Sequence, residues 1–137
     1  MVYRLICNTG YLLTIFSAGI ARDDNTRYSK AGKPDFSNAQ SISEHLMKSE
    51  PENWQDTFQT NITGQFFTTA AFLPLLAKGR DATPGYTSSV VNVASISGVM
   101  KGSSSGQFAY ATSKAGKSST WNILLSGFWL LPVAYHQ

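Results

Sequence analysis

Two short apolar runs, each stopped by serine and glycine, constrain the fold of this chain most strongly. The run 11–16 ends at Ser17-Ala18-Gly19, and the run 90–94 ends at Ser95, with Gly98 close behind. Continuous apolar, β-branched runs of this length are typical of strands buried on both faces of a sheet. Strand and helix patterns alternate along the chain, which favours an α/β fold with a parallel sheet and flanking helices.

A long amphipathic helix is predicted between these two strands. Ser49 and Glu52 stand at capping-box spacing, and apolar residues then recur at helical intervals: Trp54, Phe58, Ile62, Phe66, Ala70 and Leu73. Pro74 is expected to kink or end the helix because proline lacks a backbone donor. The polar segment 21–42 is predicted to be a long loop with one short helical turn, and 102–106 a flexible Gly/Ser connection.

The composition fits one globular domain and excludes several classes of function. Apolar residues make up 42% of the 137 residues and aromatic residues 12%, which suits a packed core. The net charge is +3, without a run of Lys or Arg, so no nucleic-acid partner is expected. The single Cys7 excludes an internal disulfide and fits a reducing, cytoplasmic compartment.

Two further apolar stretches are not expected to be targeting or membrane segments. Polar Asn8, Thr9 and Gly10 interrupt the first one, unlike the apolar centre of a secretory signal. The closing stretch 123–134 falls short of the ~20 residues that span a bilayer. We therefore expect no membrane partner. The sequence also suggests no metal site.

The pair Tyr110 and Lys114 carries the strongest chemical signal. Residues four apart on a helix share one face, so the phenol and the ammonium would point into one site. A phenol titrates near pH ~10, and its use near neutral pH requires about 4 kcal/mol of added stabilisation of the tyrosinate. A positive charge about 4 Å away, at an effective dielectric of about 20, supplies roughly 4 kcal/mol. The pair can therefore support proton transfer with an alcohol or carbonyl oxygen.

Each of these features also has an ordinary structural interpretation. Many Tyr/Lys pairs at this spacing are surface pairs in which the lysine stem covers the aromatic ring. A serine at a strand end, such as Ser95, often satisfies a turn, and Ala18-Gly19 after a strand is often a tight turn. Asn61 in mid-helix suggests a buried polar role, although a surface asparagine fits there too.

Their common location favours the chemical interpretation. Ligands of open parallel sheets bind outside the carboxyl ends of the strands. The segment 17–19, Ser95 and the start of the helix that carries Tyr110 all fall at that edge in the predicted fold. A serine hydroxyl there can donate to a carbonyl oxygen while Tyr110 delivers the proton.

The combined pattern resembles the short-chain dehydrogenase/reductase family over about residues 11–116. The matching pieces follow the family order: Ser17-Ala18-Gly19-Ile20, Asn61-Ile62-Thr63-Gly64, Val90-Val91-Asn92-Val93-Ala94-Ser95 with Gly98, and Tyr110-Ala111-Thr112-Ser113-Lys114-Ala115-Gly116. Within the family, the chain resembles members of the 3-oxoacyl-acyl carrier protein reductase type. The resemblance implies a partial Rossmann-like parallel sheet, built on the family's fourth and fifth strands with flanking helices.

The resemblance also implies a role for each matching residue. Tyr110 would be the general acid/base, and Lys114 would lower its pKa and bind the nicotinamide ribose. Ser95 would hold the substrate oxygen, with Ser97 as the neighbouring alternative. Asn61 would anchor a water that relays protons to Lys114.

The resemblance implies a nicotinamide cofactor and favours NADP over NAD. Ala18 and Gly19 would pass close to its adenosine part, and the substrate would be a small-molecule carbonyl or alcohol compound. The family's fourth and fifth helices pack against a second subunit, so a homo-oligomer would form through them.

The sequence departs from the family at both ends. The glycine-rich turn that holds the pyrophosphate is absent, because Asn8-Thr9-Gly10 is followed by Tyr11-Leu12-Leu13. Residues 1–137 are therefore expected to form a single incomplete domain, without its first half and with an atypical tail over 117–137. Lys117-Ser118-Ser119-Thr120 is expected to continue the Tyr110 helix poorly. The competing hypothesis is a truncated, non-catalytic remnant that associates with full-length relatives.

Overall fold

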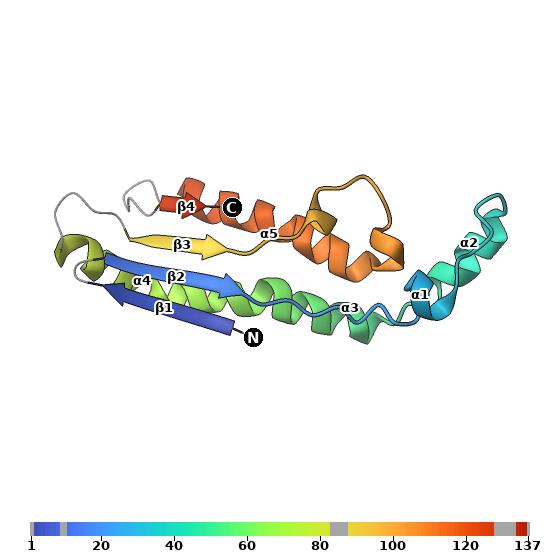
Figure 1. Cartoon of the computed structure of the whole chain (residues 1–137), viewed down its shortest axis with the longest axis horizontal. Helices are drawn as coiled ribbons and strands as arrows, with labels where there is room; N and C mark the ends of the chain where they lie inside the picture. Colours follow the sequence, from blue (N-terminus) through green and yellow to red (C-terminus); the bar gives the residue numbers. More distant parts are fainter. Residues whose placement is uncertain (1, 9–10, 83–87, 128–133, 137) are drawn as a thin grey trace.

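A computed structural model describes residues 2–8, 11–82, 88–127 and 134–136 (Figure 1). In these residues four strands form one sheet in the order β1-β2-β3-β4. They are β1 (Val2–Asn8), β2 (Tyr11–Ser17), β3 (Ser89–Asn92) and β4 (Ala134–His136). The β2, β3 and β4 strands are parallel, whereas β1 runs antiparallel to β2.

The predicted parallel strand pair is confirmed. The runs expected over 11–16 and 90–94 form β2 and β3, which pair in parallel from Leu13 opposite Ser89 to Phe16 opposite Asn92. The strand β1, which pairs antiparallel with β2 over its full length, was not predicted. The polar residues that follow its apolar part, beginning at Asn8, had no clear strand pattern.

The helices are α1 (Tyr28–Ala31), α2 (Ala39–Leu46), α3 (Pro51–Phe58), α4 (Gly64–Ala82) and α5 (Phe108–Gly127). A π turn, η1 (Gln59–Thr63), joins α3 to α4, so one continuous helical segment runs from 51 to 82. Two 3₁₀ turns, η2 (Ile96–Gly98) and η3 (Ser104–Gly106), precede α5. Figure 1 shows α1 and α2 at the end of the molecule farthest from the sheet.

The expected capping box at Ser49 and Glu52 is wrong. Glu50 is the N-cap of α3 and makes no side-chain cap, while Pro51 takes the first helical position, where its missing N–H costs nothing. The Ser49 hydroxyl accepts a hydrogen bond of 2.7 Å from the Trp54 indole instead.

One expected helix limit is also wrong, and a second is wrong in part. Pro74, expected to kink or end the helix, lies inside α4 and does not end it. Pro74 and Ala70, whose carbonyl loses its donor there, are both exposed, so water can satisfy that carbonyl. The α5 helix continues through 117–120 to Gly127, because Lys117 turns inward and is buried. The polar segment 21–42 contains the expected short helical turn, α1, and in addition the start of α2, which was not predicted.

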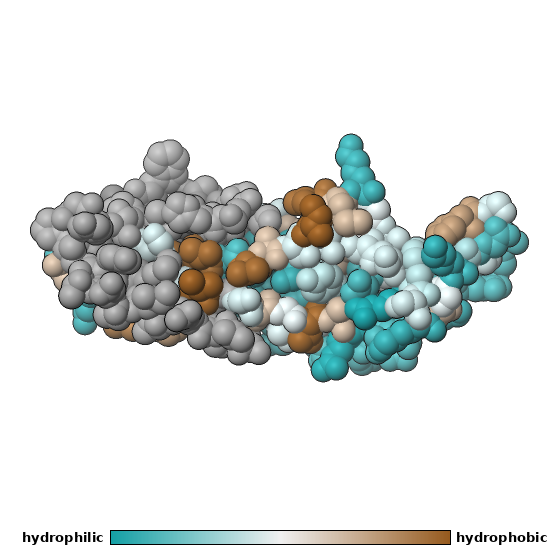
Figure 2. All heavy atoms as spheres, in the orientation of Figure 1, coloured by the Kyte–Doolittle hydropathy of each residue, from teal (hydrophilic) through white to brown (hydrophobic). Residues whose placement is uncertain are grey.

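The described core lies between α4 and the sheet. Leu76 on α4 is buried against Val90 on β3, with Phe72 and Leu73 packed beside them. Helix α5 packs on α3, η1 and η2. Figure 2 shows apolar side chains as separate spots over the middle of the visible face, while the end that carries α1 and α2 is largely hydrophilic. Within the described residues, no helix combines the length and apolar character that crossing a membrane requires.

Candidate active site

Tyr110 and Lys114 share one face of α5, as their spacing predicts. The Lys114 Nζ atom lies 5.5 Å from the centroid of the Tyr110 ring, within the range of a cation–π contact. Lys114 is buried and Tyr110 is half-buried. Burial lowers the pKa of the Lys114 ammonium below its ordinary value, because a charged group loses solvation inside the protein.

The carboxyl end of β2 receives the Lys114 side chain. Its Nζ donates a hydrogen bond of 3.3 Å to the carbonyl oxygen of Ala18, which also accepts one of 3.1 Å from the Gln65 amide. A Cβ atom on Gly19 would stand 2.9 Å from Lys114 Nζ, closer than such atoms approach. The absence of a side chain at Gly19 therefore lets the ammonium reach the strand end.

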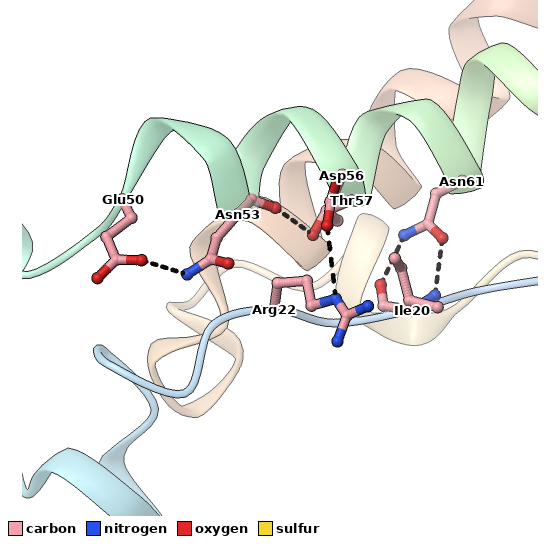
Figure 3. Close-up of polar contacts among 7 residues, drawn as sticks. All are labelled: Ile20, Arg22, Glu50, Asn53, Asp56, Thr57 and Asn61. Atoms are coloured by element: carbon pink, nitrogen blue, oxygen red, sulfur yellow. Dashed lines mark hydrogen bonds and ion pairs between the residues drawn. The ribbon is translucent and has the colours of Figure 1, made fainter.

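Asn61 clamps the chain just beyond this point. Its Oδ1 accepts from the Ile20 N–H at 2.8 Å, and its Nδ2 donates to the Ile20 carbonyl at 2.9 Å (Figure 3). Nδ2 uses its other hydrogen to donate to the Ser113 hydroxyl oxygen at 2.9 Å, and that hydroxyl donates to the Tyr110 carbonyl at 2.7 Å. Asn61 is fully buried and lies in the π turn, a local geometry that often marks functional positions.

Ser95 stands at the end of β3 as predicted, and its local role is a turn cap. It is the N-cap of η2, and its hydroxyl accepts from the Ser97 N–H at 3.2 Å. This turn packs tightly on α5, since a Cβ on Gly98 would lie 2.7 Å from the Lys114 carbonyl carbon. The structure thus brings the Ser95 turn against the helix that carries the Tyr/Lys pair. The choice between Ser95 and Ser97 stays a prediction.

Three residues of this site carried no clear sequence signal. Ser113 links Asn61 to α5, and Gln65 supports the Ala18 carbonyl. Asp23, in the polar segment after β2, is buried and accepts from two N–H groups at the start of α5. Only Ser113 could have been suspected, from its place beside Lys114. The other two contacts join residues far apart in sequence.

The site residues are suited to the nicotinamide ribose end of a dinucleotide. Lys114 Nζ makes one hydrogen bond among the described residues, and the Tyr110 hydroxyl makes none there, so both retain donors for the ribose and a substrate oxygen. Neither Ala18 nor Gly19 supplies a side chain that would obstruct a ligand at the strand end.

The strand next to β2 does not have the direction that would place a turn for the pyrophosphate near this site. In doubly wound sheets the first strand lies parallel beside the fourth, and its following turn holds the pyrophosphate. Here the strand beside β2 is antiparallel, with Val2 opposite Ser17. The end of β1, at Asn8, therefore lies beside the start of β2, whereas Lys114 lies at the end of β2.

Comparisons with known proteins show the family to which this chain belongs. The family model described as short chain dehydrogenase matches residues 31–123, a span that includes Asn61, Ser95, Tyr110 and Lys114. Over 71 residues the chain is 37% identical to the 3-oxoacyl-[acyl-carrier-protein] reductase FabG of Chlamydia pneumoniae. That stretch covers 52% of this chain and 25% of the reductase, so the chain matches about a quarter of that relative's length. No solved structure matches.

Proposed function

Because the chain belongs to the short-chain dehydrogenase family, we propose that it is an oxidoreductase that interconverts a small-molecule carbonyl compound and its alcohol. Tyr110 is the general acid/base in this proposal. The observation that carries it is the position of the Lys114 ammonium, 5.5 Å from the Tyr110 ring centroid and tied to Ala18 at the end of β2. The pair presents a phenol and an ammonium to one ligand, and the phenol can exchange a proton with the substrate oxygen.

The other residues hold the reacting groups in place. The Ser95 hydroxyl donates to the substrate oxygen, and Asn61 keeps Ile20 and Ser113 in register beside the pair. In the same proposal, Asn61 Oδ1 anchors a water on the proton path to Lys114. A Cβ on Gly19 would lie within 4 Å of both Lys114 Nζ and Asn61 Oδ1, which supports a short path.

A nicotinamide cofactor, NADP in preference to NAD by family resemblance, supplies the hydride that no side chain can provide. Tyr110 and Lys114 would bind its nicotinamide ribose, and Ala18 and Gly19 would lie beside its adenosine part. We also propose a cytoplasmic location.

Titration with NADPH and NADH, followed by nicotinamide fluorescence, tests the proposal. Micromolar binding and reduction of a carbonyl substrate are expected. Lys114→Met should weaken binding, and Tyr110→Phe should keep binding while turnover is lost. Absence of binding up to millimolar dinucleotide would contradict the proposed activity of this chain.

The antiparallel direction of β1 favours a second candidate, a non-catalytic chain that associates with copies of itself or with full-length relatives. Phe67 and Leu75 on α4 are 66% and 49% exposed, and such large apolar side chains are suited to a subunit interface. Sedimentation of the purified chain tests this candidate. A dimer that Phe67→Asp converts to a monomer supports it, and a wild-type monomer counts against self-association.

A further inference from the structure

The segment that follows β2 is tied to α5 at successive levels. We call residues 18–27 the strap. Three contacts with α5 run antiparallel to the helix: Ala18 to Lys114, Ile20 through Asn61 to Ser113, and Asp23 to Ala109 and Tyr110. Two further contacts join Thr26 to Gly106 and Arg27 to Gln107, just before the helix. The strap lies outside the span matched by the family model, and its central tie is Asp23.

Asp23 caps the first turn of α5 from a distant part of the chain. Its Oδ1 accepts from the Ala109 N–H at 2.8 Å and its Oδ2 from the Tyr110 N–H at 3.1 Å. These are the second and third residues of the helix, whose amides an N-cap side chain usually satisfies. Gln107 occupies the N-cap position, but its side chain bonds Arg27 and the Ser104 carbonyl instead.

The surroundings make this carboxylate a constrained group. Asp23 is 4% exposed, and a charge at this depth is retained only where hydrogen bonds compensate its lost solvation. The two amides and the partial positive charge of the helix N-terminus provide that compensation. The adjacent Asp24 differs in each respect, because it is exposed and pairs with the exposed Lys30 at 2.7 Å.

We propose that Asp23 is a positioning residue for Tyr110, fixing the rotation of the first turn of α5 so that the phenol and the Lys114 ammonium both face the end of β2. The proposal rests on the proposed function for its catalytic meaning. Asp23 acts through the backbone of Tyr110 and contacts neither substrate nor cofactor. Because its two oxygens hold consecutive amides, it constrains both the position of the helix end and its rotation about the axis. A single-acceptor cap would constrain only the position.

Two variants separate these effects. Asp23→Asn retains one acceptor and faces the other amide with a donor, whereas Asp23→Ala removes both acceptors. Asp24→Asn is the matched control, since it removes a neighbouring carboxylate of the same charge outside the site. Circular dichroism establishes that each variant keeps its helices.

The first readout is independent of turnover. Nuclear Overhauser contacts between the Lys114 side chain and the α-hydrogens of Gly19, which lie close together where the strap meets α5, should be present in wild type and Asp24→Asn, weakened in Asp23→Asn and lost in Asp23→Ala. Contacts that persist unchanged in a folded Asp23→Ala would overturn the proposal.

The second readout is the rate of carbonyl reduction. In Asp23→Asn, kcat should fall on the order of tenfold, while KM and dinucleotide affinity stay near wild type. An equal loss of kcat in Asp24→Asn, or a loss confined to KM, would overturn the proposal. A wild-type chain that neither binds dinucleotide nor turns over contradicts the proposed function instead, and the Overhauser contacts then decide the role of Asp23 alone.

Discussion

Gly19 is the residue whose size controls how Lys114 reaches the end of β2. In Gly19→Ala the new Cβ would crowd the flexible end of Lys114, at 2.9 Å from Nζ and 3.3 Å from Cε, and would make an ordinary 3.8 Å contact with Asn61 Oδ1. We expect the fold to survive and the ammonium to move, with turnover falling on the order of 10- to 100-fold. Thermal unfolding and carbonyl reduction measure the two effects. Gly102→Ala is the control, because its Cβ would make an ordinary 3.7 Å contact with Met100.

Asn61 stabilises the fold as well as the site. Asn61→Ala leaves the Ile20 N–H and carbonyl without their partner, which should lower the free energy of unfolding by about 2–4 kcal/mol. Urea denaturation measures the change. Asn53→Ala, which removes an exposed 3.2 Å contact with Glu50 on the same helical segment (Figure 3), should change it by less than about 0.5 kcal/mol. Equal effects of the two substitutions would contradict the clamp.

Lys117 should make stability depend on pH above neutrality. It is 1% exposed, and its Nζ donates to the Val93 carbonyl at 2.9 Å. Burial, followed by the charge of Lys114, lowers its pKa from 10.5 to about 8. Below about pH 8 both folded and unfolded chains hold the proton, and the buried charge costs the folded chain about 3 kcal/mol.

Folded Lys117 loses its proton first as the pH rises, so the free energy of unfolding should increase between about pH 8 and 10.5. Urea denaturation across this range measures the increase. Lys117→Met should reduce the increase, leaving the part that comes from buried Lys114, and the exposed Lys101→Met should leave it intact. An increase of the same size in Lys117→Met would assign the effect to other groups.

At the scale of elements, the close packing of η2 on α5 depends on Gly98, which has no side chain. The Cβ of Gly98→Ala would meet the Lys114 carbonyl group and the Ala115 nitrogen at 2.7–2.9 Å. These are backbone atoms of a helix, so the turn that carries Ser95 must shift away from α5. We expect a loss of about 1–3 kcal/mol in unfolding free energy together with reduced turnover, measured on the same sample. Loss of turnover without loss of stability would contradict this packing argument.

The elements that could be predicted from sequence are those with a local pattern. The apolar runs predicted β2 and β3, and the spacing of Tyr110 and Lys114 predicted that both side chains lie on one face of a helix. The sequence could not show that Pro74 leaves its helix unbroken, because this depends on whether the carbonyl one turn earlier can reach water, which tertiary packing decides. Asp23 could not be found at all, since its role as a cap is defined by a contact with residues 86 positions away.

At the scale of the whole molecule, the order of the sheet predicts a gradient of protection. The β2 and β3 strands each have a partner on both sides, whereas β1 and β4 each pair on one side among the described strands. Amide hydrogen exchange should therefore be slowest in β2 and β3 and faster in β1 and β4. Mass spectrometry of peptic fragments measures this gradient. Fast exchange of β2 together with β1 would contradict the hairpin.

The strap has a consequence for how the chain acquires its site. The hydrogen bonds of the strap to η3 and α5 join residues 80 to 96 positions apart, and closing such long loops is paid for before the contacts contribute. The Tyr110 site should therefore form late in folding. During synthesis the strap is made well before α5. The Asp23 carboxylate therefore stays hydrated until the backbone N–H groups that it caps have been synthesised.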